Sequence, residues 1–124
     1  MVEWQPITEA ALRKRIAQGV ARMSAACRRL WEAVRVEPEK WALHPYGDAG
    51  GGFWVVAIIG RSVIWYNDIE EGFNRSRYSC HGRIDDYWRN DDELDVALAY
   101  LNNAIELGAD LLRLRRPPER KGRK

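Results

Sequence analysis

The sequence predicts an α+β domain in which an antiparallel sheet of three or four strands is flanked by a long N-terminal helix and a C-terminal helix. Three observations lead to this fold class: a helical apolar stripe in the first third of the chain, a strand-length apolar run in the middle, and a second helical stripe near the end. With 124 residues, of which 46% are hydrophobic and 31% charged, the chain is long enough for one core. We therefore expect a single domain over residues 1–116, followed by a basic disordered tail over residues 117–124.

The first helix is predicted by an apolar stripe that runs from Thr8 to Val34 in steps of three and four residues. The stripe consists of Leu12, Ile16, Val20, Met23, Cys27, Leu30, Trp31 and Val34. Thr8 is the expected N-cap, and Gly19 beside the stripe either bends the helix or allows a close contact. An unbroken helix of this length would be roughly 40 Å long at 1.5 Å per residue. Pro38 is expected to end the segment.

The middle of the chain changes from a helical to a strand-like pattern. Trp41–His44 is expected to form a short strand that Pro45 stops, and Asp48–Gly52 a flexible loop. Phe53–Ile59 is a continuous apolar run rich in β-branched and aromatic residues, which is typical of a central strand.

A hairpin follows, because Gly60-Arg61 is a two-residue connection with glycine first, as in a type II′ turn. The predicted register pairs Ile59 with Ser62, Ala57 with Ile64, and Val55 with Tyr66. Both faces of the hairpin are then apolar, and we expect the face with Trp54 and Trp65 to receive the helices. The opposite face consists of Val55, Ala57, Ile59, Ile64 and Tyr66. It must be covered by the C-terminal segment, by the first helix or by a second copy of the chain, which makes a homodimer a candidate.

An outer strand and a last helix complete the predicted order. Phe73–Cys80 alternates arginines with smaller polar residues, as on an outer strand. "NDDEL" predicts a helix start with Asn90 as N-cap and Glu93 in a capping box. The apolar stripe of this helix consists of Leu94, Ala97, Leu98, Leu101 and Ile105. Gly108 is expected to end the helix, unless Leu111 and Leu112 extend it by a turn.

Charge is segregated along the chain, although the formal net charge is only +2. Thr8–Arg35 carries seven basic and two acidic residues, whereas Tyr66–Asp95 carries four basic and nine acidic residues. The C-terminal cations are Arg113, Arg115, Arg116, Arg120, Lys121, Arg123 and Lys124. This tail and the basic first helix make nucleic-acid binding the alternative function, although no helix-turn-helix, zinc-finger or RNA-binding aromatic signature accompanies them.

The acidic residues divide into a structural set and a candidate surface. Asp91, Asp92, Glu93 and Asp95 are explained by the first turn of the last helix, where acids oppose the helix dipole. The candidate protein-binding surface consists of Asp68, Glu70, Glu71, Asp85, Asp86 and Trp88. "DIEEG" lacks the spacing of a calcium loop, so a cation shared between these carboxylates is the weaker alternative.

Catalytic and metal chemistry find little support in the sequence. Cys80 and His81 are adjacent, and neighbouring residues of a strand point to opposite faces, so they are poorly placed to pair as nucleophile and base. Cys27 lies on the apolar stripe, and no pair of Cys and His has the spacing of a zinc site. We expect no enzymatic activity, no metal and no cofactor. The chain has no apolar stretch of membrane-spanning length, no signal peptide and no disulfide framework, so we expect a cytoplasmic protein.

Two segments, "VIWYNDIEEGFN" and "GRIDDYWRNDDEL", resemble segments of small uncharacterised bacterial proteins of the toxin-immunity type. The resemblance lies within Val63–Leu94, about a quarter of the chain, and includes no catalytic signature, so no functional residue is carried over. It implies a small cytoplasmic α+β domain that binds a toxin without chemistry of its own. The expected function is therefore non-catalytic protein binding, immunity-like or accessory, in which an acidic surface attracts a basic partner.

Overall fold

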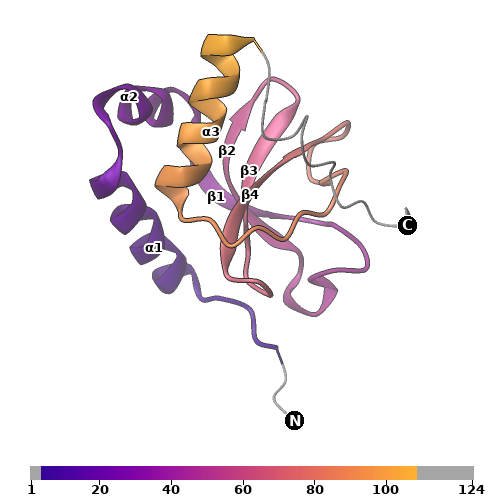
Figure 1. Ribbon diagram of the computed structural model, residues 1–124. Helices are drawn as coiled ribbons and strands as arrows, with labels where there is room; N and C mark the ends of the chain where they lie inside the picture. The colour runs from indigo at the N-terminus through magenta and orange to yellow at the C-terminus, as the bar shows by residue number, and fades with distance from the viewer. Residues whose placement is uncertain (1–3, 109–124) are drawn as a thin grey trace.

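The computed structural model describes residues 4–108 and shows the predicted α+β fold, with helices before and after an antiparallel sheet (Figure 1). The elements are α1 (Glu9–Arg22), α2 (Ala25–Val34), β1 (Arg35–Trp41), the 3₁₀ turn η1 (Asp48–Gly50), β2 (Phe53–Ile59), β3 (Ser62–Asn67), β4 (Gly72–Arg77) and α3 (Leu94–Leu107). The four strands lie in the order β1-β2-β3-β4, and each neighbouring pair is antiparallel. All three helices share one core with the same face of the sheet.

The first helical segment is broken in two, so the expectation of one unbroken helix from Thr8 to Val34 is wrong. Met23 has an extended backbone, and the Ser24 hydroxyl accepts the Cys27 N–H at 3.1 Å, which caps the start of α2. The apolar stripe hides the break because Met23 itself is buried at the corner. Thr8 caps α1 as predicted. No helix within residues 4–108 is long and apolar enough to cross a membrane.

Gly19 allows a close contact and does not interrupt α1. A Cβ built on Gly19 would lie 2.7 Å from the Cβ of Leu94, at the start of α3. The two helices therefore touch at a point where a larger residue would hold them apart.

The first strand begins directly after α2 and ends at Trp41, so the expected strand over Trp41–His44 is wrong. Pro38 lies within β1 instead of only ending a helix, and the register of β1 on β2 shifts between Arg35 and Glu39. A proline is tolerated here because β1 is an edge strand, where a missing N–H donor costs little. The loop that was expected over Asp48–Gly52 contains η1.

The central hairpin has the predicted strand bounds for β2, and Gly60 has the positive φ of 56° that the predicted turn requires. Ile59 pairs with Ser62 and Ala57 with Ile64 as predicted, but Val55 pairs with Trp65 and not with Tyr66. The cause is an irregularity of the bulge type between Val55 and Ala57. The helices pack on the face with Ile64 and Tyr66, so the predicted face is wrong for Trp65. Trp54 does pack against the core shared with the helices, because the bulge changes the alternation along β2.

The other face of the sheet is covered by the chain itself. Its core consists of Trp41, Leu43, Phe53, Val55, Val63, Trp65, Ile84, Tyr87 and Trp88. The segment around Ile84–Trp88 thus lies over the sheet face with Trp65, for which the sequence predicted the helices. Of the five residues that the sequence left to be covered, four lie in the core shared with the helices (Ala57, Ile59, Ile64 and Tyr66) and Val55 lies in the core of the other face. The argument for a homodimer from an exposed apolar face is therefore lost.

The last helix starts at Leu94, later than predicted. Asn90 is not its N-cap, and no side-chain cap bond is made at Glu93, so the predicted capping box is wrong. The residues before the helix pair with β4: the Phe73 N–H donates to the Asp92 carbonyl at 2.8 Å. Gly108 ends α3 with a left-handed φ of 72°, as predicted. The extension through Leu111 and Leu112 and the basic tail lie outside the described residues.

Candidate protein-binding surface

A fully buried asparagine, Asn67, orders the turn between β3 and β4 through its side-chain hydrogen bonds. The Asn67 side chain donates from Nδ2 to the Trp88 carbonyl at 2.9 Å. Its Oδ1 accepts the N–H groups of Ile69 at 3.0 Å and of Glu70 at 3.3 Å. An asparagine that bonds the backbone two and three residues ahead is a common way to fix a turn. The turn is therefore ordered by the core, not merely a solvated connection.

Asp68 is half-buried and hydrogen-bonded to residues that precede α1. Its Oδ2 accepts the Ile7 N–H at 2.8 Å, and its carbonyl accepts the indole N–H of Trp4 at 3.1 Å. Burial raises the pKa of Asp68, while the bond from Ile7 and the nearby Lys40 act in the opposite direction. This predicted surface residue acts mainly as a structural anchor for the turn.

Glu70 and Glu71 are exposed, as the hairpin prediction implied, and Ile69 lies before them with 38% of its surface exposed. Glu71 has a φ of 61° and is the one non-glycine residue with a positive φ in the described part of the chain. This backbone region favours glycine and costs other residues on the order of 1–3 kcal/mol. The chain thus keeps a glutamate at a backbone position that glycine would occupy without strain, directly before β4.

The structure brings a further acid, Asp91, to this turn. A Cβ built on Gly72 would lie 2.3 Å from both the Asn90 carbonyl oxygen and the Asp91 Cα, so the two backbones touch. The Asn74 side chain bonds the Asn90 backbone in both directions, at 3.1 and 2.9 Å. Asp91 is exposed beside the turn. We call the group of Ile69, Glu70, Glu71 and Asp91 the acidic end.

An aromatic pair lies next to the acidic end. Tyr46 stacks on Tyr87 with ring centroids 3.8 Å apart. Burial raises the pKa of the Tyr87 hydroxyl, and the charge of Glu70 adds to this shift. Tyr46 is half-buried and therefore partly available at the surface, whereas Tyr87 belongs to the core.

Asp85 is separate from the acidic end. Its N–H donates to the carbonyl of Arg77 at 2.9 Å, at the far end of β4 from Gly72, and its carboxylate accepts the Ser79 hydroxyl at 2.8 Å. Since β4 rises about 3.3 Å per residue, its two ends are roughly 17 Å apart. Asp85 is exposed, but it cannot form one patch with Glu70 and Glu71.

Asp86 and Trp88 are interior residues, which corrects their prediction as contact residues. They are only 8% and 6% exposed. Asp86 accepts the indole N–H of Trp88 at 2.7 Å and the backbone N–H of Arg77 at 3.3 Å. Buried carboxylates need such bonds, so this pair serves to hold the segment that covers the sheet.

Within residues 4–108, each histidine ring pairs with a carboxylate. Cys27 is buried in the core, as predicted, and Cys80 is exposed. The His81 ring contacts Glu39 through Nε2 at 2.9 Å, and His44 contacts Asp48 through Nδ1. In this part of the chain no three of the His, Cys, Asp and Glu side chains are grouped so that they could hold a metal ion.

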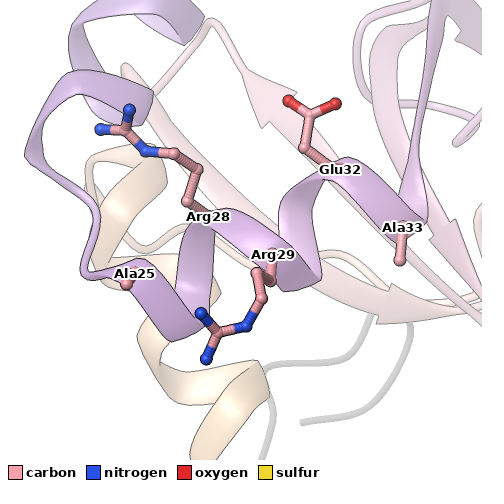
Figure 2. A pocket seen from close by; sticks show the side chains of 5 residues that line it. All are labelled: Ala25, Arg28, Arg29, Glu32 and Ala33. Carbon is pink, nitrogen blue, oxygen red and sulfur yellow. The ribbon is translucent and has the colours of Figure 1, made fainter.

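Pockets are present on the helical side of the described part of the chain. An open pocket of about 670 Å³ on the outer face of α2 is lined by Ala25, Arg28, Arg29, Glu32 and Ala33 (Figure 2). Figure 2 shows the guanidinium groups of Arg28 and Arg29 pointing away from each other, so they do not converge on one ligand. A smaller pocket of about 130 Å³ lies between α1, α2 and β1.

The basic first helical segment is less available to phosphate than its sequence suggested. Arg13 bridges Glu9 and Glu37, Arg22 bridges Glu93 and Asp95, and Arg35 pairs with Glu32. The guanidinium of Arg15 lies over the ring of Tyr66, with its carbon 5.5 Å from the centroid. The seven C-terminal cations of the nucleic-acid prediction lie outside the described residues.

In comparisons with protein-family models, curated proteins and solved structures, no match to this chain was found. The geometry of the acidic end is thus the basis for a functional interpretation. The sequence interpretation missed Asp91 and Tyr46 as members of this surface. The capping-box pattern assigned Asp91 to a helix, and no local signal connects Tyr46 with a turn more than twenty residues away.

Proposed function

We propose that this chain is a non-catalytic protein-binding domain, immunity-like or accessory, that binds a basic partner at its acidic end. The observation that carries the proposal is the strained backbone of Glu71, which keeps a glutamate where glycine would fit without cost. Strained positions of this kind gather at binding and switch sites. Neither Glu70 nor Glu71 is ion-paired with another residue of the described range, so both carboxylates are available.

The composition of the surface also favours a protein partner. Ile69 provides an exposed apolar side chain among the carboxylates, and the partly exposed Tyr46 provides an aromatic one. Protein interfaces combine apolar and aromatic anchors with a charged rim, and the charges mainly increase the association rate. The three exposed carboxylates of the acidic end would therefore attract a partner whose contact surface carries arginine or lysine.

The test is a pull-down with the chain immobilised as bait in a lysate of the source cell. We expect wild type to capture a basic protein and the E70K/E71K variant to lose it, because two attractive charges become repulsive. Asp85→Lys is the matched control, since it reverses an exposed carboxylate at the other end of β4. Capture that survives E70K/E71K, in a variant whose circular dichroism spectrum matches wild type, would refute the acidic end as the binding surface.

The homodimer is not part of this proposal, because the apolar residues on which it rested are buried or half-buried within the chain, four of them in the core shared with the helices. Nucleic-acid binding stays the untested alternative: Arg13, Arg22 and Arg35 are ion-paired, whereas the seven C-terminal cations lie outside the described residues. A toxin gene beside the gene for this chain would support the immunity-like form of the proposal over the accessory form.

A further inference from the structure

Residues 4–7, here called the strap, lead into α1 and contact a different part of the fold, the end of the sheet near η1 (Figure 1). Pro6 and Trp4 pack on the backbone of Gly50 in η1: a Cβ built on Gly50 would lie 2.8 Å from Pro6 Cγ and 3.0 Å from Trp4 Cη2. Ile7 packs against the core beneath the helices. The strap is therefore docked, although it has no regular secondary structure of its own.

The strap also reaches the turn after β3. The indole N–H of Trp4 and the backbone N–H of Ile7 supply the two long-range hydrogen bonds of Asp68, at 3.1 and 2.8 Å. The preceding residue, Asn67, is fixed by the core, and Gly72 is fixed against Asp91. Asp68, the first residue of the turn, is thus fixed by the strap. The flanking residues Asn67 and Gly72 belong to β3 and β4 and are fixed by the sheet and its core.

We propose that the strap is a latch: docked on Asp68, it holds Ile69, Glu70 and Glu71 in the observed turn, and its release loosens these residues while the sheet stays folded. Two features make release easier than unfolding of the sheet. The contacts are few, and segments with few buried contacts open before the core does. Burial of the Asp68 carboxylate also raises its pKa, although the bond from the Ile7 N–H acts in the opposite direction, so desolvation of the ionised group weakens the docked state.

The latch does not depend on any partner and can be tested on the chain alone by amide hydrogen exchange measured with NMR. The reporters are the Ile69 and Glu70 amides, which donate to Asn67 inside the turn. In a Trp4→Ala variant we expect these two amides to exchange roughly 2- to 10-fold faster, the range that a net hydrogen-bond contribution implies. The Tyr78 amide, which donates to the Arg61 carbonyl at the opposite end of the sheet, should keep its rate.

Two further variants keep the test decisive. Trp4→Phe keeps most of the ring packing and removes the indole N–H, so it should show a smaller increase confined to the turn amides. Gln5→Ala is the matched control, because Gln5 is an exposed strap residue outside these contacts, and it should change no rate. Turn amides that exchange at the wild-type rate in Trp4→Ala overturn the latch. If Trp4→Ala accelerates Tyr78 as well, the fold is destabilised as a whole, and Trp4→Phe then decides: unchanged turn amides overturn the latch, and turn amides that alone exchange faster support it.

Discussion

A methyl group added at Gly72 would separate Glu71 from Asp91. A Cβ at this position would lie 2.3 Å from the carbonyl oxygen of Asn90 and 2.3 Å from the Cα of Asp91. Both are backbone atoms, so no side-chain rotation can relieve the contact. In a Gly72→Ala variant the turn and the segment before α3 must therefore move apart.

The expected loss of stability has two parts. Forcing an extra carbon into a filled site costs about 1–3 kcal/mol. The separation also weakens the bond from the Phe73 N–H to the Asp92 carbonyl, which is 2.8 Å long in the folded chain, and a net hydrogen bond contributes about 1 kcal/mol. We therefore expect Gly72→Ala to lower the free energy of unfolding by about 2–4 kcal/mol in total.

Urea unfolding followed by circular dichroism measures this loss as a lower midpoint with an unchanged slope. Gly108→Ala is the matched control: its Cβ would meet no atom within 4 Å, and its left-handed φ of 72° makes alanine unfavourable for the backbone alone. That variant should lose about 1–2 kcal/mol, less than Gly72→Ala. A Gly72→Ala protein within about 0.5 kcal/mol of wild type, the usual range of a neutral surface change, would refute the contact between the turn and Asp91.

Two further predictions concern the turn residues. Asn67→Ala removes three hydrogen bonds of a fully buried side chain, so we expect about 2–4 kcal/mol less stability in urea; a loss below about 1 kcal/mol would contradict its role in ordering the turn. Burial raises the pKa of Asp68, so the stability that its protonation contributes is fully present below the unfolded pKa of about 3.9 and is lost as the pH rises through the folded pKa. As the pH falls from 7 toward the folded pKa, wild type should therefore gain stability relative to Asp68→Asn in urea unfolding, and equal pH dependence in both proteins would show that Asp68 does not titrate in this way.

Local chemistry explains which parts of the fold could be predicted. The β2 bounds and the hairpin turn depend on an apolar run and on Gly60-Arg61, and both signals lie within a few residues of the structure they determine. The register near Val55 was wrong because a bulge depends on how the two strands and their packing partners fit together. The bounds of β1 could not be predicted for the same reason. Pro38 is compatible with a strand only because β1 lies at the edge of the sheet, and this position depends on the whole fold.

The helical segments show a second limit of periodicity. A stripe with steps of three and four residues continues through the corner at Met23, because that residue is buried on the same side as its neighbours. Ser24 was the available signal for the break, since serine favours N-caps. The "NDDEL" pattern led to the opposite error, because it predicted a helix start that is absent. The Asn90 backbone bonds the side chain of Asn74 in β4 instead of starting a helix.

The candidate surface could be predicted only where the turn itself determines exposure. Glu70 and Glu71 follow from the hairpin, and they are exposed. The burial of Asp86 and Trp88 depends on the segment that folds over the sheet, and the proximity of Asp91 depends on the close approach at Gly72. Neither contact has a signal in the neighbouring sequence.

The most direct test of the proposed function is to measure which carboxylates a bound partner covers. Carbodiimide labelling with mass spectrometry would be applied to the chain alone and to the complex recovered from the lysate. We predict that Glu70, Glu71 and Asp91 lose reactivity in the complex, whereas the exposed Asp85 and Glu106 keep it. Equal labelling of Glu70 and Glu71 with and without the captured protein would contradict binding at the acidic end.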